Sequence, residues 1–113
     1  MVMQYRPWGY FKTLAIGHNY KVKELTVFPG EAISFQIHEH RDELWHFVGG
    51  EGVMDLGDLR FPVRYGQVQP IGKGVLHSIE CTGGEDLVII EVQTGSYLEE
   101  DDIVRLRDKY GRA

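Results

Sequence analysis

The stretch Ala32–Val48 reads AISFQIHEHRDELWHFV, with apolar and polar residues alternating on both sides of a short polar turn. Side chains two apart along a β-strand point to the same face of the sheet. We therefore expect Gln36, His38 and His40 to share one face of the strand that enters the turn. Glu43 comes just after the turn and opens the next strand. The stretch predicts β-structure that carries imidazoles and a carboxylate close together.

Short strand-like segments separated by turn residues fill most of the remaining chain. Turns recur about every eight to twelve residues, which is typical of an antiparallel sandwich or barrel. The apolar run Val88–Ile90 predicts a strand buried on both faces. The tail Ser96–Arg112 fits either a short helix or a strand. The expected strands are Tyr20–Phe28, Ala32–His40, Glu43–Val48, Val53–Leu56, Leu59–Val63, Gly66–Pro70, Leu76–Glu80 and Leu87–Gln93.

Size and composition indicate one folded domain over residues 1–113. The chain has 113 residues, 42% of them hydrophobic, and a net charge of -5. That charge, without a Lys/Arg-rich block, argues against nucleic acid or an anionic membrane as a partner. A lone cysteine, Cys81, fits a reducing compartment and a small buried apolar role. With no signal peptide and no apolar stretch of about 20 residues, we expect a cytoplasmic protein.

His38, His40, Glu43 and a downstream His77 form a candidate metal site. Imidazole and carboxylate ligands together suit Zn, Mn, Fe, Co or Ni. His77 would arrive from a separate strand, so that rigid strands hold the metal ligands. The alternative is an ordinary β-protein in which these histidines are surface or core residues.

Two ordered motifs resemble those of the cupin family. The resemblance implies an all-β cupin double-stranded β-helix, a jelly-roll small barrel, with one divalent metal ion bound at its mouth. The motifs read Gly30…His38-x-His40-x-x-Glu43…Gly50 and Gly66…Pro70-x-Gly72…His77.

A narrower resemblance covers almost the whole chain. Arg6–Gly9 (RPWG), Val22–Gly30 (VKELTVFPG) and Ile33–Trp45 resemble the C-terminal cupin of type II mannose-6-phosphate isomerases. The most specific match is Glu91–Leu98 (EVQTGSYL), which continues as Glu100–Arg112 (EDDIVRLRDKYGR). In many relatives this cupin follows a mannose-1-phosphate guanylyltransferase part. The present sequence has no G-x-x-x-x-G-K-[ST] loop, and we expect no guanylyltransferase activity.

The resemblance implies a metal-dependent isomerase that interconverts mannose 6-phosphate and fructose 6-phosphate through an enediol. Such a reaction needs a base that moves a proton between C1 and C2 and a cation that holds the phosphate. Glu91, His46 and Lys23 are the candidate bases, and Arg41 and Arg105 the candidate phosphate ligands. Each has a plainer alternative as a solvated side chain or a structural ion-pair partner.

Polar and aromatic residues of the same strands are candidate substrate contacts. Gln36 shares the face of the metal ligands, and Gln93 shares that of Glu91, inside the expected barrel. Trp45 lies two residues from Glu43, on the same face of the strand, and would form one wall of the pocket. The simpler alternative is that it packs in the core.

Two other functions and a dimer complete the expectations. A cupin of this kind can bind a sugar or another metabolite through its metal without chemistry, and cupin oxygenases use the same three-histidine, one-glutamate set. Cupins commonly pair into homodimers, and the segment Tyr5–Leu14 is the expected pairing edge.

Overall fold

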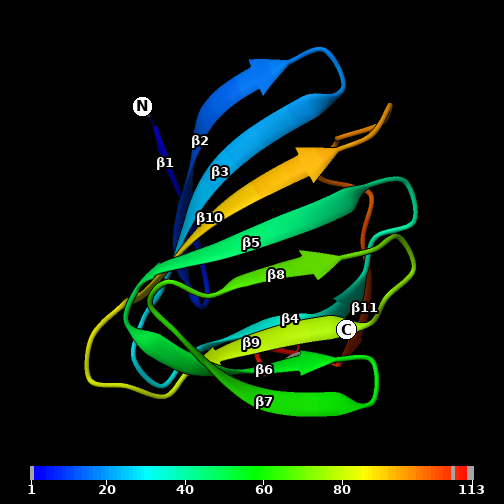
Figure 1. The fold of residues 1–113 in the computed structure, drawn as a ribbon. Coiled ribbons are helices and arrows are strands. Elements are labelled where there is room, and N and C mark those ends of the chain that lie inside the picture. The colour runs from blue at the N-terminus through cyan, green and yellow to red at the C-terminus, as the bar shows by residue number, and fades with distance from the viewer. Residues whose placement is uncertain (1, 108, 112–113) are drawn as a thin grey trace.

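The computed structural model describes residues 2–107 and 109–111, which form strands and turns with no helix. Figure 1 shows two antiparallel sheets facing each other. The all-β expectation is confirmed. Asp108 and Arg112 of the quoted C-terminal motif lie outside the described residues. In spatial order, the six-stranded sheet contains β1 (Met3–Arg6), β2 (Gly9–Gly17), β3 (Tyr20–Val27), β10 (Leu87–Thr94), β5 (Asp42–Gly49) and β8 (Val68–Ile71), and the five-stranded sheet contains β11 (Val104–Arg107), β4 (Ala32–Ile37), β9 (His77–Cys81), β6 (Glu51–Leu56) and β7 (Leu59–Arg64).

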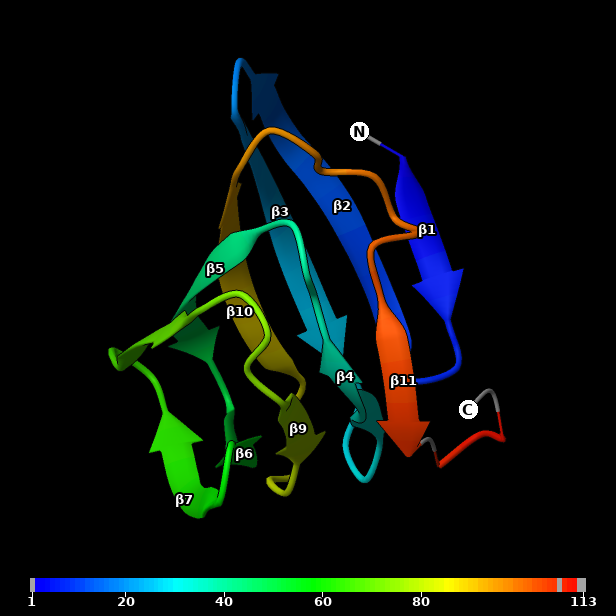
Figure 2. The ribbon, with the colours of Figure 1, turned by 90° about the vertical axis from the view of Figure 1, so that its right-hand side faces the viewer.

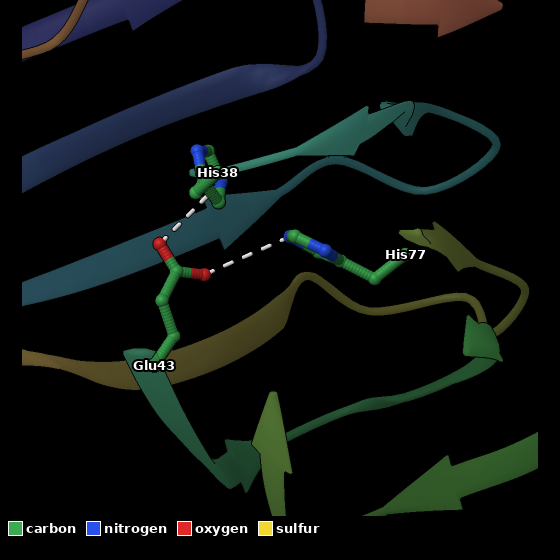
Figure 3. A group of neighbouring side chains, drawn as sticks. All are labelled: His38, Glu43 and His77. Carbon is green, nitrogen blue, oxygen red and sulfur yellow. Dashed lines mark ion pairs between the residues drawn. The ribbon is translucent and has the colours of Figure 1, made fainter. Parts of the chain in front are cut away.

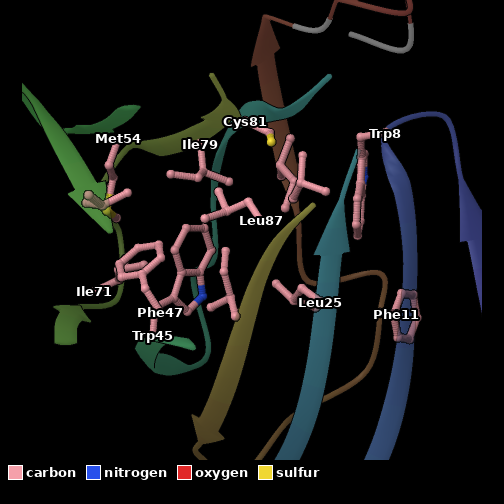
Figure 4. Packing of buried hydrophobic residues seen from close by; sticks show 14 residues of the cluster. Trp8, Phe11, Leu25, Trp45, Phe47, Met54, Ile71, Ile79, Cys81 and Leu87 are labelled. Carbon is pink, nitrogen blue, oxygen red and sulfur yellow. The ribbon is translucent and has the colours of Figure 1, made fainter. Parts of the chain in front are cut away.

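The hydrophobic core lies between the two sheets. Strand β5 shows how it forms, since Trp45 and Phe47 point inward with 1% and 0% exposure while their neighbours in sequence face out. Leu87 and Ile89 of β10 pack beside them, and Met54 and Ile79 meet them from the opposite sheet (Figure 4). Cys81 is fully buried in the same cluster, as expected.

Gly50 lets the chain pass from one sheet to the other. β5 and β6 are consecutive in sequence but belong to different sheets. Gly50 joins them with φ = 73°, a region that disfavours residues with a Cβ atom. An added Cβ would lie 2.3 Å from the carbonyl oxygen of Asp86, so space as well as backbone angle requires glycine here.

The predicted strands are present, with shifts of a few residues at their ends. The exception that matters for the site is β4, which ends at Ile37 and not at His40. The tail forms strand β11, which settles the choice between helix and strand. Burial of Val88–Ile90 on both faces is wrong, because only Ile89 is fully buried and its two neighbours are only partly buried on the outer face.

The segment between β10 and β11 joins the two sheets at one end of the barrel (Figure 2). It leaves the six-stranded sheet at Thr94 and enters the five-stranded sheet at Val104, beside β4. Lys21 Nζ of β3 donates a hydrogen bond to the carbonyl oxygen of Leu98, 2.8 Å away, and Lys23 Nζ pairs with Glu100. The described part of the chain contains no helix that could span a membrane.

Candidate metal centre

His38, Glu43 and His77 form a buried cluster between the sheets. Their candidate ligand atoms all lie within 4.8 Å of one another. Glu43 Oε2 is 3.5 Å from His38 Nε2, and Glu43 Oε1 is 3.7 Å from His77 Nε2. Figure 3 shows the carboxylate reaching toward both rings.

Two strands and the residue that follows a third supply these side chains. His38 directly follows β4, Glu43 lies in β5 and His77 begins β9. Antiparallel pairing of β4 with β9 places Gln36 opposite His77, so one end of the five-stranded sheet delivers both histidines. β5 delivers the carboxylate from the facing sheet.

Both histidine rings are oriented by backbone carbonyl groups. His38 Nδ1 is 2.7 Å from the carbonyl oxygen of Asp102, and His77 Nδ1 is 3.0 Å from that of Val75. A carbonyl oxygen only accepts hydrogen bonds, so each Nδ1 carries the proton. Each Nε2 therefore presents a lone pair toward Glu43, the tautomer needed for metal ligation.

Two polar atoms of the cluster are left without a partner. Glu43 Oε1 and His77 Nε2 are buried and have no hydrogen-bond partner among the described residues. An unsatisfied buried polar group costs about 1–3 kcal/mol. Both atoms carry lone pairs, so a proton donor between them or a cation would satisfy them. Ligand atoms about 2.1 Å from a tetrahedral ion lie about 3.4 Å apart, so the residues present fit a divalent metal ion.

Burial sets the charge of the cluster. It lowers the pKa of His77 to about 4. It also lowers the pKa of His38, with a further contribution from the Arg41 guanidinium. Both imidazoles are therefore neutral at neutral pH, which is the form that binds metal. Burial raises the pKa of Glu43, although Arg41 opposes the rise. A cation bound beside the carboxylate would stabilise its charged form.

His40 is not part of this cluster. Its side chain is exposed, and its ring packs edge-on against Tyr97 at 5.5 Å. Because β4 ends at Ile37, residues 39 and 40 lie in a bend and the two-residue alternation stops after His38. The structure thus brings together three of the four expected ligands.

A pocket adjoins the cluster and shares His38 with it. Its charged lining comes from both sheets and from the segment before β11, and its apolar lining includes Trp45. Of the residues expected to take part in chemistry or binding, the pocket is lined by Lys23, Gln36, Arg41, Trp45, Glu91 and Arg105.

Glu91 is an inward carboxylate, as the alternation of β10 predicted, and is 5% exposed. Trp45 Nε1 donates a hydrogen bond to its Oε2 at 2.8 Å, and Gln93 Nε2 donates to its Oε1 at 2.7 Å. Burial, and then the charge of Glu43, raise the pKa of Glu91. Gln93 is fully buried behind Glu91 and is absent from the pocket lining.

The three basic pocket residues that the sequence singled out differ in their surroundings. Lys23 is buried, paired with Glu100 and placed 4.3 Å from the centre of the Phe11 ring. Arg41 is buried against the metal cluster, with Nε 2.7 Å from Glu43 Oε2. Arg105 reaches the pocket from β11, opposite Gln36 of β4.

His46 lies on the other side of the sheet. It alternates with the inward Trp45 and Phe47, is exposed, and pairs with Val68 on the outer surface. The expectation that His46 could exchange a proton with a ligand in the pocket is therefore wrong, because the sheet separates the two.

Asp102 is the residue that the sequence did not single out for the site. Beyond its carbonyl bond to His38, its carboxylate accepts hydrogen bonds from the amides of Glu39 at 2.9 Å and His40 at 3.0 Å. The available signal was the specific match of Glu100–Arg112, which contains Asp102 but does not show what its side chain contacts.

Comparison with known families agrees with the geometry. Residues 2–108 match the family described as mannose-6-phosphate isomerase C-terminal. The chain belongs to this family. It is a cupin, and the expected double-stranded β-helix is confirmed. The mannose-6-phosphate isomerase C-terminal match covers nearly all of the sequence, including every residue of the metal cluster and the pocket.

Curated relatives are much longer than this chain. The xanthan biosynthesis protein XanB of Xanthomonas campestris pv. campestris (strain B100) is 44% identical over 108 residues, which are 96% of this chain and 23% of that protein. The mannose-1-phosphate guanylyltransferase of Escherichia coli K12 is 44% identical over 109 residues, with the same coverage. The chain therefore spans about a quarter of the length of these relatives.

Solved structures share the fold at lower identity. The capsular polysaccharide assembling protein CapF from Staphylococcus aureus superposes with a TM-score of 0.82 at 21% identity, over 94% of this chain and 34% of that one. A predicted oxalate decarboxylase from Thermotoga maritima gives a TM-score of 0.72 at 25% identity, over 76% of this chain and 79% of that one. Proteins with this cupin fold thus have different functions, so the function of this chain has to be inferred from the residues of its site.

Proposed function

We propose that this chain is a metal-dependent sugar-phosphate isomerase that interconverts mannose 6-phosphate and fructose 6-phosphate. One observation carries the proposal: the buried His38–Glu43–His77 cluster opens, through His38, onto a pocket lined by basic residues and a buried carboxylate. Membership of the mannose-6-phosphate isomerase C-terminal family supports it.

The metal would be one divalent ion held by His38, Glu43 and His77. Zn, Mn, Co, Ni and Fe all accept this ligand set. When bound, the ion would polarise the substrate's carbonyl group as a Lewis acid. The carbonyl contacts of Asp102 and Val75 keep both rings in the ligating orientation.

The pocket supplies groups for the two ends of the substrate. Arg41 and Arg105 would bind the phosphate, since guanidinium groups match phosphate oxygens in a forked geometry. Gln36 and Trp45 would contact the sugar. Glu91 is the carboxylate that could take a proton from C2 and return it to C1, because it is inward-facing, lines the pocket, and has a pKa that burial raises.

The test is an isomerase assay on protein reconstituted with each metal in turn. We expect fructose 6-phosphate to form from mannose 6-phosphate, followed by ¹³C NMR, and to stop when a chelator removes the ion. His77→Ala should lose both metal and turnover. Metal-loaded protein that converts no hexose phosphate would refute the isomerase.

A metal-dependent binding protein is the second candidate function, and one observation favours it. Both oxygens of Glu91 already accept hydrogen bonds from Trp45 and Gln93. A carboxylate held in this way can serve structure alone. Tight binding of mannose 6-phosphate in calorimetry, with the sugar recovered unchanged, would support binding without catalysis.

A further inference from the structure

The Arg41 guanidinium contacts two of the three residues of the metal cluster. Its Nε donates to Glu43 Oε2 at 2.7 Å, and its Nη2 lies 3.3 Å from His38 Nε2. The side chain is only 7% exposed, so these contacts are made away from water. Arg41 therefore already provides a positive charge at this end of the cluster.

Arg41 and a metal ion need the same lone pair. His38 Nδ1 carries the proton that bonds to the Asp102 carbonyl, which leaves Nε2 as the acceptor for the Arg41 N–H. A metal ion bound to Nε2 would take that lone pair. Glu43 is different, because Oε2 contacts Arg41 while Oε1 is unpartnered and faces His77. Metal binding thus requires Arg41 to leave His38 but lets it stay with Glu43.

The guanidinium group released from His38 can turn into the adjoining pocket. Arg41 also lines the pocket that holds Lys23 and Arg105. With Nε kept on Glu43, the terminal nitrogens are the part that must turn away from His38. Beside Lys23 and Arg105 they would meet an anionic ligand, and like-charge repulsion from the metal favours the same movement.

We propose that Arg41 couples the metal centre to the ligand pocket: a metal ion displaces its Nη2 from His38, and the freed N–H groups then bind the ligand's phosphate. The inference rests on the proposed metal centre and sugar-phosphate pocket, and it concerns binding alone. Metal and sugar phosphate should then bind cooperatively, each tightening the other by the same factor.

Calorimetry can test this with Co²⁺ and mannitol 6-phosphate, a sugar phosphate that lacks the carbonyl group and cannot be isomerised. In the wild type, saturating Co²⁺ should tighten mannitol 6-phosphate binding about tenfold. Arg41→Met should bind Co²⁺ about tenfold tighter, because no guanidinium competes for His38, and should show at least about fivefold less coupling. Arg41→Lys keeps a charge near Glu43 but lacks the forked donor, and should also bind Co²⁺ more tightly than the wild type.

Lys23→Met is the matched control, because it removes a buried charge from the same pocket but leaves the contact with His38 intact. It should weaken mannitol 6-phosphate binding with and without Co²⁺ by similar factors, so that the coupling survives. Nitrogen-15 NMR of the wild type should show the Arg41 side-chain signals shifting when Zn²⁺ is added.

The results of these experiments distinguish the proposed coupling through Arg41 from the proposed isomerase reaction. Equal Co²⁺ affinity in the wild type and both Arg41 variants, or equal coupling in all of them, would overturn it. Failure of the wild type to bind Co²⁺ or Zn²⁺ would overturn the metal centre and the coupling together. Coupling that depends on Arg41, in protein without isomerase activity, would support the inference and reject only the proposed reaction.

Discussion

The His38 ring is held by the backbone of Asp102, a residue 64 positions further along the chain, across 2.7 Å from Nδ1 to the carbonyl oxygen. The carboxylate of Asp102 at the same time accepts hydrogen bonds from the backbone amides of residues 39 and 40. The bend that carries the first metal ligand is therefore held by the segment that crosses from one sheet to the other. Metal affinity should depend on the structure of that segment.

Replacing Asp102 with Ala should destabilise the protein and weaken metal binding. Loss of a side chain that accepts two backbone amides, as a helix cap does, costs about 1–2 kcal/mol. Metal affinity should fall by less than about tenfold, because the substitution loosens residues 39 and 40 but keeps the backbone carbonyl that contacts His38. Urea unfolding and Zn²⁺ calorimetry measure the two effects. Asp101→Ala is the control, because Asp101 is exposed and contacts Tyr97, and it should change neither quantity by more than about 0.5 kcal/mol.

The contribution of Asp102 to stability should be lost in acid. Burial alone would raise its pKa, but the amides of Glu39 and His40 outweigh that effect and the pKa lies below its usual value. The stabilisation is complete above the unfolded pKa of about 3.9. It is lost as the pH falls through the lower folded pKa.

A comparison of metal-free wild type with Asp102→Asn gives this profile. The difference in free energy of unfolding should be constant from pH 7 to about pH 5 and should shrink below about pH 4. A difference that stays constant down to pH 2 would show that the carboxylate is not held in its charged form.

The sequence predicted most of the fold because local and global preferences agree. Strand β5 alternates exposed and buried residues from Asp42 to Phe47, and β10 places Glu91 and Gln93 on the inner face as its pattern required. Gly50, the turn between β5 and β6, was likewise visible as a motif glycine. In these elements the two-residue period of a strand decides which side chains face the core.

The two-residue alternation gave wrong predictions at two places. One lies beyond the end of strand β4, and the other is on the outer face of strand β10. His40 has the parity of His38, but β4 ends before both, and the bend is set by the distant Asp102. Ile90 belongs to an apolar run yet is only partly buried, on the outer face. The contacts that bring Asp102 to the site join segments far apart in sequence, which periodicity does not encode.

His40→Ala and His77→Ala should differ sharply in metal binding. A ligand that binds only the folded state stabilises it by about 2.7 kcal/mol at one hundred times its Kd. Zn²⁺ should raise the melting temperature of the wild type and of His40→Ala to a similar extent, because His40 is exposed and lies outside the cluster. His77→Ala should show no such rise. A loss of the metal-dependent rise in His40→Ala would mean that the bend refolds to bring His40 to the ion.

The N-terminal hairpin should mediate a homodimer. β1 is the edge strand of the six-stranded sheet, and its Tyr5 is 64% exposed. An open edge with exposed aromatic and apolar side chains is suited to pairing with a second copy. Light scattering at micromolar concentration should give the mass of a dimer, and Gln4→Pro should shift it toward monomer. A monomeric wild type at that concentration would remove the prediction.

Glu91→Gln should separate chemistry from binding. The amide keeps the size of the carboxylate, and Gln93 can turn its own amide to keep one hydrogen bond, so the fold should survive. Loss of a general base typically lowers kcat by about 10²–10⁴-fold. Zn²⁺ binding should persist, since Glu91 lies outside the ligand cluster. His46→Ala, on the outer face, should leave kcat unchanged. If Glu91→Gln instead retained wild-type turnover while losing stability, Glu91 would be a structural partner of Trp45, and Lys23 would be the remaining inward candidate for the base.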